Sequence, residues 1–349
     1  MRRPPGGGAH DGPDGSGDMA LGIDVGGTKV LGVVLDRWGR VLAEKKLELA
    51  LSWKGSATTA SSNDIGGPVG ESRATGSAGG REVIGDSREG SGADAVLHLI
   101  RILSLELSTE VAGDPGAAVI PRIGLGIPGA MDEAGIPQFS ANLRALQGID
   151  ASQRLMEQLG EESGMHDAGD CLRVVVENDA NCALVGEAVL GAAKGFDDVL
   201  LVTLGTGIGG ALVVGGRLVH GAHGYAGEVG HVPVEPGGIQ CPCGRRGCFE
   251  RYVSGTASVY ISVDEMPGYL ARALAAVILV VDPAVVVVGG GFGAAMGERL
   301  LSPSRRLLPG LLPEYGGGQV PELVPAELGE RAGAIGAALL ALALEPAAG

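Results

Sequence analysis

The 349-residue sequence has little positive charge, few cysteines and no long apolar run. Its 26 lysine and arginine residues are outnumbered by 41 aspartate and glutamate residues, which gives a net charge of −15. A field of this sign repels phosphate backbones, so a nucleic-acid site would need a strong local basic patch. The basic pairs, such as Arg245-Arg246, are short. We therefore expect no nucleic-acid partner.

The apolar segments are too short to cross a membrane. One of the longest, ALAAVILVV (Ala273–Val281), ends at Asp282-Pro283, whereas a spanning helix needs about 20 apolar residues. The first residues do not have the basic and apolar regions of a secretion signal. Five cysteines are an odd number, which argues against a secreted disulfide framework. We expect a cytoplasmic protein with no membrane partner.

Composition divides the chain into regions. Residues 1–18 are rich in Gly, Pro and Asp and predict a disordered N-terminal tail. Residues 52–92 have no hydrophobic period and predict a flexible surface insertion. Between them, three apolar runs separated by turn signals predict a three-strand meander: Ala20–Val25, Val30–Leu35 and Val41–Leu47.

After the insertion, strand and helix patterns alternate. Helices are predicted at Ala93–Val111, Asp150–Ser163, Ala180–Ala193, Leu270–Val281 and Glu330–Leu344. Strands are predicted at Arg122–Gly129, Cys171–Asp179 and Ala284–Val288, with a strand, turn, strand and hairpin over Val199–Val219. This alternation indicates an α/β architecture. Ligands in such folds gather at the carboxyl ends of strands.

Two glycine turns join pairs of predicted strands. In DVGGTK (Asp24–Lys29), the glycines let backbone N–H groups approach an anion, and Asp24 could orient a hydrated metal ion on a nucleotide. By itself this turn could equally be a plain hairpin. A second turn, LGTGIGG (Leu204–Gly210), favours a polyphosphate held from two sides. The strand VVVVGGGFG (Val285–Gly293) ends in glycines that suit a flat adenosine surface.

Asn178 and Asp179 follow a predicted buried strand and begin a helix. Either side chain could serve only as a helix N-cap, which is common for these residue types. In the functional interpretation, Asp179 is a general base that accepts a proton from an attacking hydroxyl, and Asn178 binds neighbouring hydroxyls. Glu187, farther along the same helix, is interpreted as an ordinary helix residue.

With these motifs in this order, the sequence resembles the ROK family of sugar kinases and sugar-responsive repressors. The resemblance implies an α/β, two-domain actin-like ATPase (ribonuclease H-like) fold, with a nucleotide and sugar cleft between domains at 19–142 and 143–330 and a C-terminal helix, 331–349, that packs back on the first domain. The matching motifs occur in family order: DVGGTK, GIPGAMD, ENDANCALVGEA, LGTGIGG, GEVGH, CPCGRRGCFERYVSGTA, VVVVGGGFG and GERAGAIGAALL.

The resemblance also implies roles for single residues. Asp179 becomes the catalytic base that deprotonates the sugar hydroxyl. The sugar hydroxyls would be bound by Asn142, Asn178, Asp179, Glu228, His231 and Glu250. The ATP phosphates would be lined by Gly26, Gly27, Thr28, Lys29, Gly205, Thr206 and Gly207, with Asp24 nearby and Gly289 and Gly290 close to adenosine.

CPCGRRGC places Cys241, Cys243 and Cys248 within eight residues. Three thiols and one imidazole suit tetrahedral structural zinc, and a disulfide is disfavoured in the cytosol. Thiols without metal remain the alternative. His220, His223 and His231 are all candidate fourth ligands, and the GEVGH match to the family favours His231. The zinc loop then spans 231–248. Zinc on one nitrogen of His231 would hold its other nitrogen toward the sugar.

Two stretches depart from the family pattern. After SGTA the family usually carries a few dozen helical residues, whereas only SVYISVDEMPGY separates Ala257 from Leu270. We therefore expect helices that cover the second domain to be missing. In addition, SANLRAL replaces the usual Pro-Asn-Leu pattern around Asn142.

The resemblance predicts an ATP-dependent sugar kinase with Mg²⁺ on its ATP and a structural Zn²⁺, assembled as a homodimer or homotetramer. A glucokinase that phosphorylates the 6-hydroxyl of glucose is the first choice. The alternatives are an N-acetylglucosamine or N-acetylmannosamine kinase, and a non-catalytic sugar-binding regulator.

Overall fold

The computed structural model describes residues 19–49, 92–114, 119–140, 143–163, 172–313 and 320–343. The predicted tail 1–18 and all but the last residue of the predicted insertion 52–92 lie outside the described residues, as do Asn142 and Cys171. Among the described residues, no helix is long and apolar enough to span a membrane.

The first sheet has the strand order β3-β2-β1-β4-β7. The predicted meander is confirmed as three antiparallel strands: β1 (Met19–Val25), β2 (Lys29–Asp36) and β3 (Val41–Glu48). Two parallel strands continue the sheet, β4 (Arg122–Ile127) and β7 (Arg173–Asn178). The predicted helices α1 (Gly92–Ala112) and α2 (Ala151–Ser163) contact this sheet, and a small hairpin of β5 (Ala130–Met131) and β6 (Pro137–Phe139) follows β4.

The second sheet repeats this arrangement with the order β10-β9-β8-β11-β12. Strands β8 (Val199–Leu204), β9 (Ile208–Val214) and β10 (Arg217–Leu218) are antiparallel, and β11 (Val285–Gly289) and β12 (Glu322–Pro325) are parallel to β8. Its helices are α4 (Glu250–Val253), α5 (Met266–Val281), α6 (Gly291–Met296) and α7 (Glu298–Leu307). The two halves of the chain therefore have the same order and direction of strands.

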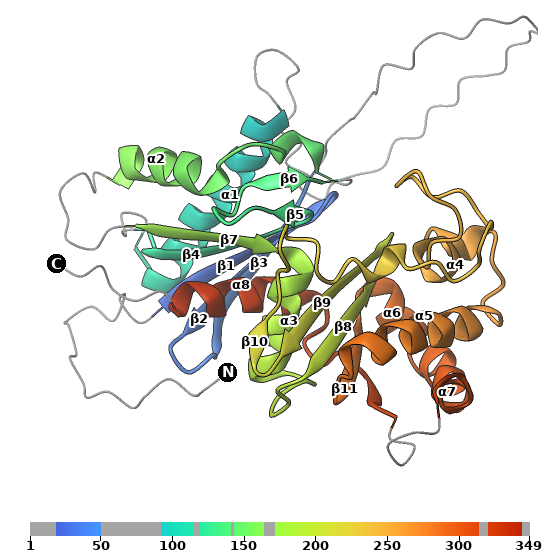
Figure 1. Cartoon of the computed structure of the whole chain (residues 1–349). Helices are drawn as coiled ribbons and strands as arrows, with labels where there is room; N and C mark the ends of the chain where they lie inside the picture. Colours follow the sequence, from blue (N-terminus) through green and yellow to red (C-terminus); the bar gives the residue numbers. More distant parts are fainter. Residues whose placement is uncertain are drawn as a thin grey trace, which may run out of the picture.

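Two helices connect the halves. Helix α3 (Asp179–Leu190) follows the last strand of the first sheet and packs on β8 and β9, whereas α8 (Ala332–Leu342) follows the second sheet and packs on β1 and β4 (Figure 1). The two helices also pack on each other. A Cβ atom on Gly124 would collide with the backbone of Ala337, and one on Gly336 with the backbone of Cys182. Glycine is therefore required where α8 crosses the first sheet and α3.

The predicted domain boundary at residue 143 would assign α2 and β7 to the second domain. In the structure, β7 pairs with β4 over the register Arg122↔Arg173 to Ile127↔Asn178, so the first sheet extends to Asn178. Sequence patterns also missed α7 and β12. In α7, Leu300, Leu301 and Leu307 keep helical spacing, but Pro303 in its interior argues against a helix. Strand β12 has four residues and ends in proline, so it is too short to show a clear period.

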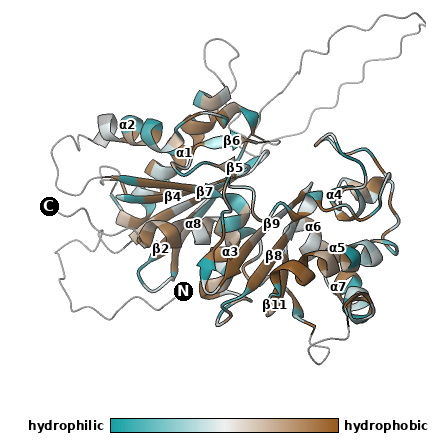
Figure 2. Ribbon diagram, viewed as in Figure 1, coloured by the Kyte–Doolittle hydropathy of each residue, from teal (hydrophilic) through white to brown (hydrophobic). Residues whose placement is uncertain are grey.

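Hydrophobic residues lie along strands β8, β9 and β11 of the second sheet (Figure 2). The short segment after SGTA forms one 3-10 turn, Ala257–Val259, and leads to α5. There the second core is closed by Met266, Leu270 and Leu274 of α5, all buried. The rings of Tyr252 and Tyr269, with centroids 4.5 Å apart and their planes tilted by 35°, join α4 to α5. Helix α5 thus supplies the cover over the core at this place.

Candidate active site

The carboxyl ends of the three parallel strands β1, β4 and β7 bring acidic and amide side chains together. Asp24 near the end of β1 pairs in register with Gly126 of β4, and Gly126 pairs with Glu177, two residues before Asp179. A Cβ atom on Gly126 would lie 3.6 Å from the Cα atom of Asp179. The strand register, not the sequence separation of 155 residues, therefore places Asp24 beside Asp179.

The carboxyl groups of Asp24 and Asp179 are half-buried and electrostatically coupled. Burial, followed by the nearby Asp179 carboxylate, raises the pKa of Asp24 to about 7, and Lys29 opposes this shift. Burial also raises the pKa of Asp179; the Ala180 N–H opposes that shift and the Glu228 carboxylate adds to it. Desolvation and like charge both disfavour the ionised form of a carboxyl group. Raised pKa values of this kind are expected of carboxyl groups that accept protons or bind cations in an active site.

Asn178 is the N-cap of α3. Its Oδ1 accepts a hydrogen bond from the Asn181 N–H at 3.0 Å, which is the ordinary capping role. Its Nδ2 donates to the Gly129 carbonyl at 2.9 Å, so the amide also fixes the turn after β4. Asp179 follows the cap, and its Oδ1 accepts from the Ala180 N–H at 2.9 Å. The capping interpretation is thus correct for Asn178, and Asp179 also takes part in the first turn through the Ala180 N–H.

The first glycine turn lies between β1 and β2. The Gly26 N–H donates to the Lys29 carbonyl at 2.9 Å, and Gly27 and Thr28 are exposed. The Lys29 ammonium, predicted to face phosphates, donates to Glu330 Oε2 at 2.8 Å. Lys46 binds the same oxygen at 2.8 Å, and the pKa of Glu330 is lowered to about 2 by these two lysines.

The second glycine turn lies between β8 and β9 and is tied to the segment after α4. The Gly255 N–H donates to the Gly205 carbonyl at 2.7 Å, and the Thr256 hydroxyl donates to the Thr206 carbonyl at 2.8 Å. Glu250 Oε2 accepts from the Ile208 N–H at 3.1 Å. A Cβ atom on Gly207 would lie 2.5 Å from this carboxylate oxygen. The turn that was predicted to bind phosphate therefore contacts a residue that was predicted to bind sugar.

A pocket of about 510 Å³ opens beside this second turn. It is lined by Gly205, Thr206, Gly255, Thr256, Gly291 and Phe292. Gly205 and Thr206 were predicted to bind nucleotide, whereas Gly255, Thr256 and Phe292 were not given a role. The sequence did point to these residues, because SGTA and GGGFG are parts of two motifs that match the ROK family. Gly289 and Gly290, predicted near adenosine, precede this pocket at the end of β11, and Gly290 is the N-cap of α6.

Glu228, His231 and Glu250 come from the segment between β9 and α5. Glu228 and His231 flank the 3-10 turn Val229–His231, which contacts β9, and His231 Nε2 lies 3.9 Å from Glu228 Oε2. Burial raises the pKa of Glu228, His231 lowers it, and Glu250 raises it further. Glu228 thus lies close enough to act electrostatically on Asp179, and Glu250 close enough to act on Glu228. Asn142 lies outside the described residues.

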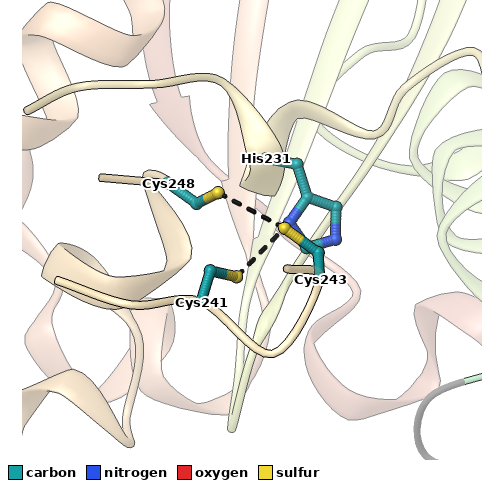
Figure 3. A group of neighbouring side chains, drawn as sticks. All are labelled: His231, Cys241, Cys243 and Cys248. Atoms are coloured by element: carbon teal, nitrogen blue, oxygen red, sulfur yellow. Dashed lines mark hydrogen bonds between the residues drawn. The ribbon is translucent and has the colours of Figure 1, made fainter. Parts of the chain in front are cut away.

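The Cys/His cluster is formed by one loop. Isolated bridges pair Pro233 with Cys248 and Gln240 with Arg246, which folds the loop back on itself. Figure 3 shows the side chains of His231, Cys241, Cys243 and Cys248 pointing toward one another. One ligand atom of each lies within 4.8 Å of the others. His231 is thus the histidine in the cluster, whereas the Nε2 atom of His220 binds Glu177.

The distances within the cluster fit a tetrahedral metal ion. The Sγ atoms of Cys243 and Cys248 are 3.6 Å apart, and Cys241 Sγ is 3.8 Å from His231 Nδ1. A disulfide requires about 2.05 Å between sulfur atoms, so these cysteines are free thiols. Zn–S bonds of about 2.3 Å give a tetrahedral edge of about 3.7 Å. The ring presents Nδ1 to the thiols and Nε2 to Glu228.

Glu187, interpreted from sequence as an ordinary helix residue, is fully buried. Its carboxylate accepts hydrogen bonds from the backbone N–H groups of Ala192, Glu327 and Leu328. It therefore joins the end of α3 to the segment that leads into α8. The sequence carried no signal for this role, because the partner segment lies 140 residues away and offers only backbone groups.

Comparisons with known proteins agree with this arrangement. The sequence pattern described as "ROK family" matches residues 110–264 and 259–344, and its two parts meet at the short segment after SGTA. The glucokinase of Thermotoga maritima is 32% identical over 301 residues, which cover 74% of this chain and 88% of that protein. The N-acetyl-D-glucosamine kinase of Pectobacterium carotovorum is 30% identical over 289 residues, covering 70% of this chain and 88% of that protein.

Among solved structures, a ROK family glucokinase from Streptomyces griseus in complex with glucose and AMPPNP matches with a TM-score of 0.64 and 26% identity. The match covers 92% of this chain and 98% of that chain. The fold is that of the actin-like ATPases, as predicted, with one strand arrangement repeated in two sheets and two helices exchanged between them. The chain belongs to the ROK family.

Proposed function

We propose that the protein is an ATP-dependent sugar kinase of the hexokinase type, and that glucose is its substrate, with transfer of the γ-phosphoryl group to the 6-hydroxyl. The observation that carries this proposal is the half-buried Asp179 carboxyl group at the carboxyl edge of the first sheet. It lies beside Asp24 and within the electrostatic influence of Glu228. The family relationship to glucokinases supports the same activity.

In this mechanism Asp179 accepts the proton of the attacking hydroxyl as its oxygen approaches the γ-phosphorus. A carboxyl group with a raised pKa is a stronger base than an ordinary aspartate, and it is still ionised above that pKa. The rate should therefore fall as the pH drops through the raised pKa of Asp179. Most of the remaining catalysis in phosphoryl transfer comes from positioning and charge neutralisation.

The two glycine turns would bind the ATP phosphates through backbone N–H groups, and the pocket lined by Thr256 and Phe292 would accept adenosine. Mg²⁺ bound to ATP would neutralise phosphate charge, and Asp24 is the residue that would orient its hydration shell. Lys29 would have to leave Glu330 to contact a phosphate; the two side chains are 35% and 56% exposed, so their ion pair is weak.

Glu228, His231 and Glu250, with Asn178, would bind the sugar hydroxyls. His231, Cys241, Cys243 and Cys248 would hold a structural Zn²⁺, whose role is to fix the loop. With Nδ1 engaged there, the His231 ring would present Nε2 to the sugar, and Cys248 would fix the start of α4, where Glu250 lies. Asn142 would complete the sugar site as the resemblance implies. We place this enzyme in the cytoplasm as a homodimer or homotetramer; the exposed Leu279 and Val280 of α5 are candidates for burial between subunits.

An N-acetylhexosamine kinase is the second candidate, favoured by the similarity to N-acetyl-D-glucosamine kinases. The test is a coupled ADP-release assay over glucose, mannose, fructose, N-acetylglucosamine and N-acetylmannosamine, with Asp179→Asn as the background control. We expect turnover highest with glucose. Highest turnover with an N-acetylhexosamine would select the alternative, and turnover with none of the sugars would refute the kinase proposal.

A further inference from the structure

A hydrogen bond joins strand β7, which leads directly into Asp179 at the start of α3, to the loop that leads to the proposed sugar ligands Glu228 and His231. The Glu177 carboxylate, on β7 two residues before Asp179, lies with Oε2 2.7 Å from Nε2 of His220. His220 begins the loop that runs from the end of β10 to Glu228. The Glu177 side chain is only 12% exposed, and that of His220 is 52% exposed. A contact shielded on one side is stronger than a fully exposed ion pair.

The other oxygen of Glu177 is fixed by the start of α3. Oε1 accepts from the Asn178 N–H at 2.8 Å and from Asn181 Nδ2 at 2.9 Å. Asn181 is nine-tenths buried, and its own N–H is bound by Asn178. The Glu177 carboxylate is thus held rigidly relative to Asp179, because the same helix turn binds both. Because one oxygen of the Glu177 carboxylate is fixed on the first sheet, the other oxygen can position the His220 side chain.

The rest of this loop touches both halves of the molecule. A Cβ atom on Gly224 would collide with the carbonyl of Met131 in β5, and one on Gly227 with the carbonyl of Gly210 in β9. The loop therefore packs against the first half at Gly224 and against the second half at Gly227. The start of the loop is also bound to both halves, by the Val219 N–H to the Leu212 carbonyl of β9 and by the His220 side chain to Glu177 of β7.

We propose that Glu177 and His220 form a positioning pair that sets the distance between the base, Asp179, and the sugar ligands Glu228 and His231. This inference rests on the proposed sugar-kinase function. Neither residue needs to touch the substrate. Their contribution is to hold the loop in the arrangement that binds sugar, so loss of the pair should weaken sugar binding far more than nucleotide binding.

The first experiment replaces His220 by alanine, with His223→Ala as the matched control. His223 is an exposed histidine three residues later in the same loop. We expect His220→Ala to raise the sugar KM and the sugar Kd about tenfold, within the range for contacting charged pairs, and to leave the ATP KM nearly unchanged. His223→Ala should change neither. Equal effects of the two variants, or equal loss of sugar and nucleotide affinity, would overturn the proposal.

The second experiment adds Glu177→Gln, which keeps an acceptor oxygen for Asn178 and Asn181 but removes the charge facing His220. If the pair acts as a unit, Glu177→Gln should weaken sugar binding in the natural background and add little in the His220→Ala background. Additive effects would contradict the pairing. Thermal unfolding of each variant separates loss of the fold from loss of the pair.

Sugar affinity is measured by calorimetry with glucose and N-acetylglucosamine, in addition to turnover. If no sugar is phosphorylated but glucose binds and His220→Ala weakens that binding, the kinase proposal fails and the positioning proposal stands. If glucose is phosphorylated and His220→Ala leaves KM and Kd unchanged, the positioning proposal fails by itself.

Discussion

The two glycine turns have similar sequences and lie at equivalent places in the two sheets, yet their surroundings differ. The first turn, between β1 and β2, exposes Gly27 and Thr28, and its lysine is paired with Glu330 at the surface. The second turn, between β8 and β9, is bonded to Gly255 and Thr256, and the Glu250 carboxylate covers Gly207. The first turn is open to solvent, whereas the second is packed against the segment that follows the Cys/His cluster.

This difference suggests that the two halves contribute differently to catalysis and to binding. The first half supplies charged groups with raised pKa values, Asp24 and Asp179, which suits proton and cation chemistry. The second half supplies the pocket and a turn connected to the sugar ligand Glu250. Changes at Asp24 and Asp179 should therefore affect the chemical step, whereas changes at the second turn should affect binding.

The largest effect is expected from Asp179→Asn. Removing the general base should lower kcat by about 10²–10⁴-fold, because proton transfer by a positioned side chain contributes this factor. Nucleotide affinity, measured by calorimetry, should remain close to that of the natural protein, and sugar affinity should fall far less than kcat. A variant that keeps a tenth or more of its kcat would exclude Asp179 as the base.

Next in size is Cys243→Ser, in the second half. Elemental analysis should find about one zinc per chain in the natural protein and none in the variant, since structural zinc takes four ligands. Loss of the metal should raise the sugar KM by about tenfold or more, because groups that hold a binding residue in place have effects of this size. Cys182→Ser, at a buried cysteine outside the cluster, is the control for metal content. Active protein that contains no metal would refute the zinc proposal.

A direct comparison of the turns uses Gly207→Ala and Gly26→Ala. A methyl group at position 207 would displace Glu250 from the Ile208 N–H, whereas one at position 26 would meet only the Lys29 carbonyl, at 3.2 Å. We expect Gly207→Ala to raise both KM values by about tenfold, the value of one hydrogen bond to a charged group. Gly26→Ala should have a smaller effect, confined to ATP. Equal effects on sugar KM would remove the asymmetry between the turns.

The last prediction concerns stability and its pH dependence, not activity. The folded-state pKa of Asp24 is about 7, above its ordinary value of 3.8, so the folded protein binds this proton more tightly than the unfolded chain does. The protonated carboxyl thus stabilises the fold fully below about pH 4, and that stabilisation is lost as the pH rises to about 7. Asp24→Asn should have an unchanged Tm near pH 4 and a raised Tm above pH 7. A Tm difference that does not depend on pH would contradict this account.

Much of the fold could be predicted from local patterns. The meander 19–48, helices α1, α2, α3, α5 and α8, and the strands that end in glycine turns all follow hydrophobic periods and turn residues. The motifs also led to Asp179, to the glycine turns and to His231 as the histidine in the cluster. Helix α7 and strand β12 were missed because a proline interrupts one and the other has four residues.

The sequence by itself determined the chemistry of this protein: which carboxyl, thiol and imidazole groups are present, and in what local spacing. Only the tertiary structure decided which of them meet. Parallel pairing of β1, β4 and β7 places Asp24 beside Asp179, and the exchange of α3 and α8 buries Glu187 under backbone groups 140 residues away. The bond between Glu177 and His220 arises in the same way. Such contacts depend on strand register and helix crossing, which local sequence patterns do not encode.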